Sequence, residues 1–132
     1  MTVNKDNFIE AFIKLSIEHG ENYDDLNKID NKLNKKLTAQ TASFDDFLAK
    51  DIAFAKNTLD FLIKTDSFYV MVSVAWALWK FNYRMKDCYR LFEKIISNKE
   101  KKHGLSVIAA EAAFDAIKEG RLKRRKEYPK LD

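Results

Sequence analysis

The sequence has few of the residues that interrupt helices. Its 132 residues include one proline, Pro129, and three glycines, Gly20, Gly104 and Gly120. Proline costs about 3 kcal/mol in a helix interior and glycine about 1 kcal/mol. The glycines lie at the edges of apolar-periodic segments, where a helix end or a turn would use them. Because strict apolar/polar alternation and hairpin dipeptides are also lacking, the sequence predicts an all-α chain.

Cysteine and long hydrophobic runs are nearly absent. Cys88 is the only cysteine, so no internal disulfide can form, and a reducing cytoplasm is the simplest compartment. We expect Cys88 to be a buried structural thiol. The N-terminal MTVNKDNFIEAF offers no hydrophobic signal region. The longest nearly uncharged run, 67–79, has thirteen residues, whereas a membrane span needs about 20. We therefore expect a cytoplasmic protein that does not enter a membrane.

Catalytic and metal-binding patterns are missing too. His19 and His103 are the only histidines. They do not lie at metal-ligand spacing from each other, and neither lies at such a spacing from Cys88. We expect both at the surface near helix ends. No glycine-rich loop is present to cradle a phosphate. The sequence therefore predicts a protein that is not an enzyme and binds no cofactor or metal, and it leaves open one enzyme class, a hydrolase with carboxylates from separate helices.

Six segments follow the 3.6-residue period of a helix. We expect helices at about 4–19, 23–41, 44–64, 67–81, 84–97 and 105–119. Gly20 is expected to end the first, and the third is expected to break near Lys50. The second carries a narrow apolar stripe that includes Leu26 and Ile29. The fourth is apolar nearly all round, which predicts a central helix with contacts on several sides.

An internal repeat is the most specific pattern of organisation. VMVSVAWALW (70–79) aligns with LSVIAAEAAF (105–114) at an offset of 35 residues, and an amphipathic helix precedes each copy. The aligned pairs include Val70 with Leu105, Val72 with Val107, Val74 with Ala109, Ala75 with Ala110, Ala77 with Ala112 and Trp79 with Phe114. Two helices per ~35 to 45 residues is the period of helical-hairpin solenoids. The alternative is chance similarity between two helices rich in alanine and valine.

SVAWAL and VIAAEAAF resemble the second-helix consensus of HEAT repeats. The wider layout, from DLNKIDNKLNKKL through VAWAL to HGLSVIAAEAAFDAIKEGRL, resembles a small bacterial HEAT-like family, domain-of-unknown-function family 2019. The likeness covers about 8–122. It implies a short right-handed α-solenoid of about three antiparallel helix pairs at 1–120, followed by a basic C-terminal tail at 121–132. KTDSFYVM departs from HEAT repeats, because it lacks their intra-repeat proline and their early second-helix arginine.

The resemblance implies a scaffold that binds a macromolecule instead of turning over a substrate. Members of such small families are thought to act as immunity proteins that neutralise a toxin encoded beside them. The resemblance thus implies a non-catalytic protein-binding module whose partner is a bacterial toxin. The alternative is a nucleic-acid-binding helical-repeat protein that uses its basic C-terminal half.

The aromatic stretch VSVAWALWKFN (72–82) gives the candidate interface. The repeat-mate of Trp76 is Glu111, so Trp76 either faces the partner or packs under the N-terminal helices. Trp79 pairs with Phe114 and is expected in the core. Interface hot spots favour aromatic residues beside a cation. The predicted contacts of this part of the chain are Trp76, Lys80, Tyr83 and Glu111.

The two halves of the chain differ in charge. Residues 1–66 carry nine Lys/Arg and twelve Asp/Glu, whereas residues 67–132 carry fifteen and eight. The basic excess is densest in RLKRRKEYPK (121–130), which indicates either a nucleic-acid patch or a solvated tail. The candidate nucleic-acid contacts are Arg121, Lys123, Arg124, Arg125 and Lys126.

Acidic residues gather at two expected helix starts. They are Glu21, Asp24 and Asp25 at one, and Asp45, Asp46 and Asp51 at the next. Carboxylates at helix N-termini are ordinary local stabilisers, worth about 0.3 to 1 kcal/mol each. The alternative is that they mimic phosphate toward a basic toxin groove and speed association. Under that alternative, Asp24, Asp25, Asp45 and Asp46 belong to the partner-binding surface.

Overall fold

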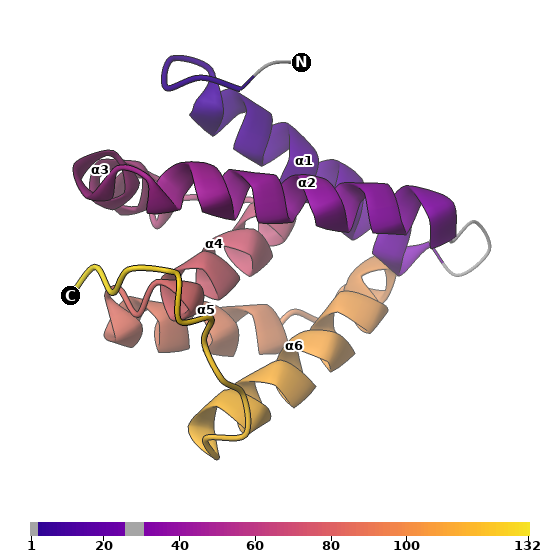
Figure 1. Ribbon diagram of the computed structural model, residues 1–132. Coiled ribbons are helices and arrows are strands. Elements are labelled where there is room, and N and C mark those ends of the chain that lie inside the picture. The colour runs from indigo at the N-terminus through magenta and orange to yellow at the C-terminus, as the bar shows by residue number, and fades with distance from the viewer. Residues whose placement is uncertain (1–2, 26–30) are drawn as a thin grey trace.

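The part of the chain that the structure describes forms six α-helices and one short 3-10 helix (Figure 1). The computed structural model describes residues 3–25 and 31–132. The elements are α1 (Phe8–Asp24), α2 (Asn31–Ala49), α3 (Ile52–Leu62), α4 (Phe68–Lys80), α5 (Met85–Ile96), η1 (Lys101–His103) and α6 (Gly104–Lys118). Within the described residues there is no strand, which confirms the all-α prediction. Leu26 and Ile29, expected on the second helix, lie outside the described residues.

α1 is longer than predicted. It continues through Gly20 to Asp24, so the prediction that Gly20 ends the first helix is wrong. The glycine is needed for close packing instead, because a Cβ atom there would overlap the ring of Tyr69 on α4. Because Gly20 has no side chain, the backbone of α1 can pack directly against the Tyr69 ring of α4.

The predicted end of the second helix is too early in the sequence. That helix was expected to stop at Thr41, but α2 runs on to Ala49. The Thr41 hydroxyl donates to the carbonyl of Leu37, four residues earlier, so it bonds within the helix instead of interrupting it. The predicted break near Lys50 is confirmed. Asp51 caps α3 there, its carboxylate accepting the N–H of Phe54 at 3.0 Å.

Phenylalanine rings hold the N-terminal helices together. Phe8 of α1 is completely buried. Its ring centroid lies 5.3 Å from that of Phe44, 5.5 Å from that of Phe47 and 5.6 Å from that of Phe54. Aromatic pairs at such distances add about 0.5 to 1.5 kcal/mol beyond their area burial. One ring of α1 therefore joins α2 and α3.

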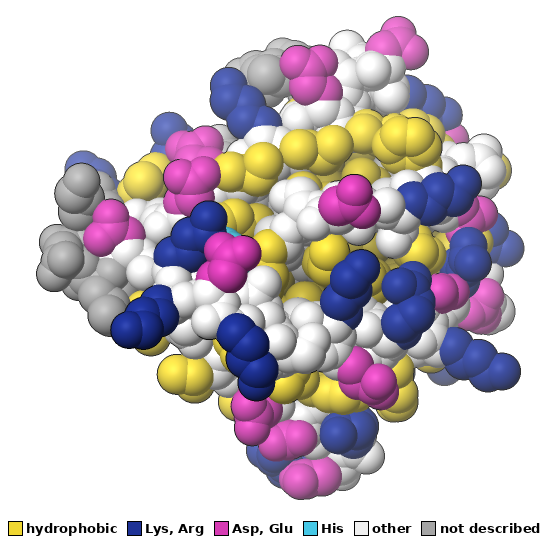
Figure 2. Space-filling view, turned by 180° about the vertical axis from the view of Figure 1, so that it is seen from behind, with side chains coloured by type: hydrophobic (Ala, Val, Ile, Leu, Met, Phe, Trp, Pro, Cys, Tyr) yellow, Lys and Arg dark blue, Asp and Glu magenta, His cyan; other side chains and the backbone are white. Residues whose placement is uncertain are grey.

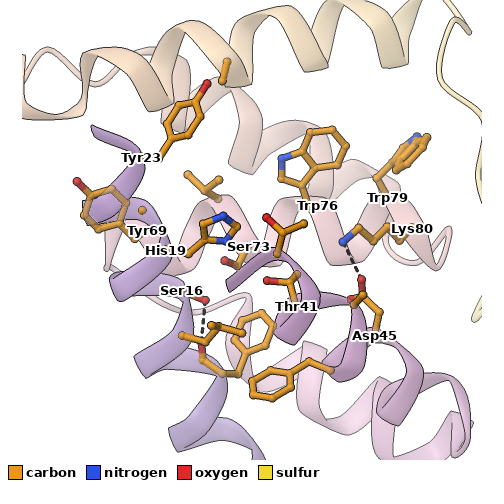
Figure 3. A pocket seen from close by; sticks show the side chains of 18 of the residues that line it. Ser16, His19, Tyr23, Thr41, Asp45, Tyr69, Ser73, Trp76, Trp79 and Lys80 are labelled. Atoms are coloured by element: carbon orange, nitrogen blue, oxygen red, sulfur yellow. Dashed lines mark hydrogen bonds and ion pairs between the residues drawn. The ribbon is translucent and has the colours of Figure 1, made fainter. Parts of the chain in front are cut away.

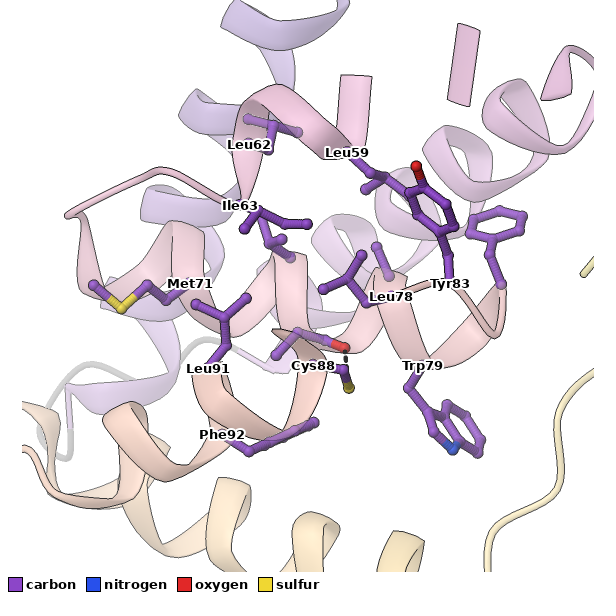
Figure 4. Packing of buried hydrophobic residues seen from close by; sticks show 14 of the residues in the cluster. Leu59, Leu62, Ile63, Met71, Leu78, Trp79, Tyr83, Cys88, Leu91 and Phe92 are labelled. Carbon is purple, nitrogen blue, oxygen red and sulfur yellow. Dashed lines mark hydrogen bonds between the residues drawn. The ribbon is translucent and has the colours of Figure 1, made fainter. Parts of the chain in front are cut away.

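α4 is the central helix, as the sequence predicts. It contacts α1, α3 and α5, and Val74 and Ala75 on it are completely buried. The small side chain of Ala75 lets α5 come close, so that the Cys88 thiol lies 3.3 Å from the Ala75 carbonyl oxygen. Figure 4 shows Leu78 of α4 and Leu91 of α5 in the same core. The burial of Cys88 confirms its prediction as a buried thiol.

The two copies of the repeat lie on α4 and α6. Ala75 and Ala110 are both buried, as are Trp79 and Phe114. Each helix contacts the next along the chain, and α1 contacts α4 and α6 as well. A contact between the first and last helices is not one that successive stacked pairs make. The structure thus establishes the helical class, and the solenoid arrangement stays a prediction.

Large apolar side chains are exposed on several separate elements. In the view from behind, hydrophobic side chains of all sizes show between acidic and basic ones (Figure 2). Over the whole described surface, the large ones are Tyr23, Ile52, Phe61, Tyr89, Ile108 and Leu122. Single exposed apolar residues are normal on a protein surface. An exposed residue is therefore a candidate for a binding site only where it lies beside a cavity.

The end of the C-terminal segment (121–132) packs on the helices through Tyr128 and Leu131, whereas most side chains of 121–127 are exposed. The Leu131 side chain is 3% exposed, and its N–H donates to the Phe81 carbonyl at 2.9 Å. The Tyr128 ring lies 5.3 Å from the Phe81 ring. The Asp132 carboxylate accepts the N–H of Arg84 at 2.7 Å. In Figure 1 this yellow segment runs back across the molecule from the end of α6.

We expect Leu131→Ala to lower the free energy of unfolding by about 2 kcal/mol, the lower end of the range for buried leucines. The control is Leu122→Ala in the same segment, where the side chain is 37% exposed and the expected change is within about 0.5 kcal/mol. Urea unfolding followed by circular dichroism measures both. Equal effects of the two substitutions would show that the segment does not pack as described.

Candidate functional site

A pocket of about 530 Å³ opens beside the central helix. α4 forms its floor, α1 and α2 form one wall, and α6 and the C-terminal segment form the other (Figure 3). We call it the α4 pocket. Its principal lining residues are Phe12, Leu15, Ser16, His19, Gly20, Tyr23, Thr38, Thr41, Phe44, Asp45, Tyr69, Val72, Ser73, Trp76, Trp79, Lys80, Ser106, Ala109, Ala110, Lys123, Arg125 and Tyr128. Small-molecule sites commonly have volumes of roughly 300 to 1,000 Å³.

Both tryptophans of the chain line this pocket. Trp76 is partly buried, and its ring meets that of Trp79 edge-on, with centroids 5.8 Å apart. It meets Phe92 of α5 in the same way at 5.9 Å. Trp79 is buried, as predicted. Trp76 therefore packs on the core with one part of its ring system and lines the pocket with another.

One end of the pocket is charged. The Lys80 ammonium lies 2.8 Å from the Asp45 carboxylate, on the facing wall. Asp45 is buried, and this burial raises the pKa of its carboxyl above the ordinary value, although Lys80 opposes the shift. Lys123 and Arg125 of the C-terminal segment also line the pocket. The charged lining side chains are thus three cations and one carboxylate.

The other end of the pocket is neutral. His19 lies there with its Nε2 atom 3.1 Å from the Asn34 side-chain oxygen. Burial lowers the pKa of His19, so the imidazole is uncharged at neutral pH. The Ser16 hydroxyl donates to the carbonyl of Phe12 at 2.7 Å and is satisfied within α1. The prediction that His19 is a surface residue is wrong, since it lies half-buried in the pocket wall.

Two of the four predicted contacts from the aromatic stretch and its repeat-mate meet in the pocket, namely Trp76 and Lys80. Tyr83 does not join them. Its side chain is 8% exposed, and its hydroxyl donates to Asp60 at 2.7 Å, so its assignment to an exposed interface is wrong. Glu111 is exposed on α6, outside the pocket lining.

The predicted acidic surface is also largely wrong, because the helix boundaries differ. Asp24 ends α1 instead of starting a helix, and its side chain is buried. Asp45 lies inside α2 and faces Lys80. Asp25 follows α1 and is partly exposed, and Asp46 is exposed and accepts a hydrogen bond from Tyr128 at 3.2 Å. Only Asp51 caps a helix start as expected.

Asp24 belongs to a buried polar cluster, which we call the Tyr69 junction: Asp24, Tyr69, His103 and Ser106. The Tyr69 hydroxyl and the Ser106 N–H each donate to the Asp24 carboxylate at 2.8 Å. His103 Nδ1 lies 3.1 Å from the Tyr69 hydroxyl. Burial and the adjacent carboxylate raise the pKa of Tyr69, so its hydroxyl stays protonated. His103 is buried here, which corrects its prediction as a surface residue.

Several of the C-terminal cations have partners within the chain. Arg121 pairs with Glu119 at 2.6 Å, and Arg125 pairs with Glu127 at 2.9 Å. The Arg124 guanidinium lies 5.1 Å from the centre of the Trp79 ring and donates to the carbonyl of the same residue. Lys123 and Lys126 are exposed. The five cations therefore do not form one free basic patch.

Burial raises the pKa of Cys88 to about 12, so its thiol is not a ready nucleophile. Residues 3–25 and 31–132 hold no group of three or more His, Cys, Asp or Glu placed to bind a metal. Over the same residues, no helix combines the length and the apolar character that crossing a membrane requires.

Comparison of the chain with protein-family models, with curated proteins and with solved structures finds no match.

Proposed function

We propose that this chain is a non-catalytic binding module for another protein, which docks across α6 and the mouth of the α4 pocket. The observation that carries the proposal is an uncovered apolar face of α6 that begins at the pocket. Ala109 lines the pocket and is exposed, and Ile108 and Ala112 are exposed as well. Ile108 is 66% exposed, more than any other large apolar side chain of the described residues. Exposed apolar surface beside a cavity is typical of an interaction site.

The spacing on α6 supports a single docking face. Ile108 and Ala112 are four residues apart, so they lie on the same side of the helix. Glu111 is exposed next to Ala112 and would belong to the polar rim of the interface. Behind this face, Trp76 and Lys80 lie in the pocket, where a side chain of the partner can reach them. The predicted contacts Trp76, Lys80 and Glu111 thus fit one surface.

The concrete form of the proposal is an immunity-type protein, built as a short HEAT-like solenoid, that neutralises a bacterial toxin in the cytoplasm. The resemblance of the α4 and α6 sequences to HEAT repeats and the uncovered face of α6 support this form. Nucleic-acid binding has less support. Three of the five candidate cations are engaged by Glu119, Trp79 and Glu127, whereas affinity for nucleic acid depends on cations free to meet phosphates.

The proposal is tested by co-expressing the chain with the product of the gene beside its own. We expect the wild type to restore growth and to bind that product, and Ile108→Lys to weaken binding about 30-fold or more, as at an interface hot spot. The matched control is Ile52→Lys on α3, where the side chain is 48% exposed and the affinity should not change. No binding by the wild type, or equal binding by both variants, would contradict the proposal.

A further inference from the structure

We propose that the α4 pocket binds a small carboxylic acid with an apolar body, whose carboxylate meets Lys80 and whose body lies along Trp76 toward His19. This site shares Trp76 and Lys80 with the proposed protein-docking surface. The proposal does not depend on that docking, because its test uses small-molecule probes and the chain alone. The ligand class includes medium-chain fatty acids and arylalkanoic acids, which share one carboxylate and an apolar chain or ring.

The body of the ligand is inferred from the walls of the pocket. Phe12 and Leu15 of α1 face Val72 and Trp76 of α4 across a space of about 530 Å³. Such a space suits a small organic molecule, and walls of this kind bind apolar surface. At the neutral end of the pocket, His19 is uncharged and the Ser16 hydroxyl already donates a hydrogen bond within α1. This end of the pocket therefore offers no charge to a ligand's ionised group. An apolar chain or ring is therefore the body that fits.

The head group is inferred from the charged end. Three cations line the pocket, Lys80, Lys123 and Arg125. Lys80 pairs with Asp45 and Arg125 pairs with Glu127, so the charged end keeps an excess of one positive charge, from Lys123. A ligand with a cationic head would meet this excess of like charge. A neutral ligand would leave the pocket cations without an added partner. A monoanion fits best, because a dianion would bring a second negative charge against Asp45.

Asp45 shows how a carboxylate is held at this place. Its oxygen lies 2.8 Å from the Lys80 ammonium, with the Trp79 ring among the neighbouring pocket walls. Burial opposes ionisation of Asp45, as its raised pKa indicates, and Lys80 favours it. The Lys80 side chain is 26% exposed and lines the pocket, and an ammonium has three donors, so one carboxylate does not use all of them.

The test uses three probes that share a ten-carbon chain: decanoate, decanol and decylammonium, each below its critical micelle concentration. Since both tryptophans line the pocket, their fluorescence reports binding directly. We expect a saturable one-to-one signal with decanoate at least about tenfold tighter than decanol, and decylammonium weakest. Equal affinities for decanoate and decanol, tighter binding of decylammonium, or no saturable signal would overturn the proposal.

Two substitutions locate the head group. Lys80→Met should weaken decanoate about tenfold and leave decanol unchanged, whereas the control Lys118→Met, at an exposed site on α6, should change neither. Asp45→Asn should tighten decanoate, because it removes the carboxylate that competes for Lys80. Decanoate binding that is unaffected by Lys80→Met, or weakened by Asp45→Asn, would overturn the proposal. The probe comparison on the unaltered protein stands even if Lys80→Met fails to fold.

Discussion

Replacing Asp24 by alanine is expected to lower the free energy of unfolding by about 3 kcal/mol. The carboxylate accepts hydrogen bonds from the Tyr69 hydroxyl and the Ser106 N–H, and hydrogen bonds to charged groups contribute about 1.5 to 3 kcal/mol each. The substitution leaves both donors without this acceptor in a buried place. It also removes the side chain through which α1, α4 and α6 meet. Urea unfolding followed by circular dichroism gives the change.

Two further variants make this result specific. Asp24→Asn keeps one side-chain oxygen as an acceptor, so we expect it to cost less than Asp24→Ala. Glu18→Ala removes an exposed carboxylate from the same helix and should change stability by no more than about 0.5 kcal/mol. If Asp24→Ala and Glu18→Ala had the same effect, the Tyr69 junction would not stabilise the fold.

The second large effect is expected from Gly20→Ala, and its sign is the reverse of the usual one. In a helix interior alanine is more favourable than glycine by about 1 kcal/mol. Here the added Cβ would overlap the Tyr69 ring, the farthest of the three ring atoms lying at 2.7 Å. The ring is held on the other side by the hydrogen bond from its hydroxyl to Asp24, so moving it away strains that bond. Overpacking costs about 1 to 3 kcal/mol, and an overlap this close belongs at the upper end of that range. After subtraction of the gain of about 1 kcal/mol from alanine, we expect a net loss of about 2 kcal/mol.

The control for this substitution is Gly104→Ala at the start of α6. A Cβ there meets nothing within 4 Å, and the residue has a helical φ of −55°, so stability should be unchanged or slightly higher. A double-mutant cycle then isolates the cause. In a Tyr69→Ala background the ring is gone, and Gly20→Ala should become stabilising. A loss of the same size in both backgrounds would rule out the overlap with Tyr69.

The helical class could be predicted because it depends on local properties: scarce glycine and proline, and a 3.6-residue apolar period. The boundaries between residues 20 and 50 could not be predicted equally well. Gly20 carries the same local signal whether it ends a helix or makes room for a ring, and only the position of Tyr69 decides. Thr41 is likewise ambiguous, since its hydroxyl can stop a helix or bond within it.

The sequence predicts only some of the residues that line the α4 pocket. Trp76 and Lys80 drew attention because they lie in one apolar helix beside a repeat, which is a local pattern. Asp45 was assigned to a separate acidic surface and Lys123 to a basic tail, although all of them line one pocket. Their meeting requires α2 to cross α4 and the end of the chain to return. Local sequence patterns do not predict contacts between segments so far apart in the chain.

The Tyr69 junction has a consequence for how the chain folds as it is synthesised. Asp24 and Ser106 are 82 residues apart, as are Asp46 and Tyr128. At about 5 to 20 residues per second, a ribosome needs about 4 to 16 s to add that length of chain. During this interval the end of α1 carries a carboxylate whose α6 partner does not yet exist. The nascent N-terminal helices therefore depend on the last third of the chain before they can settle into their final packing.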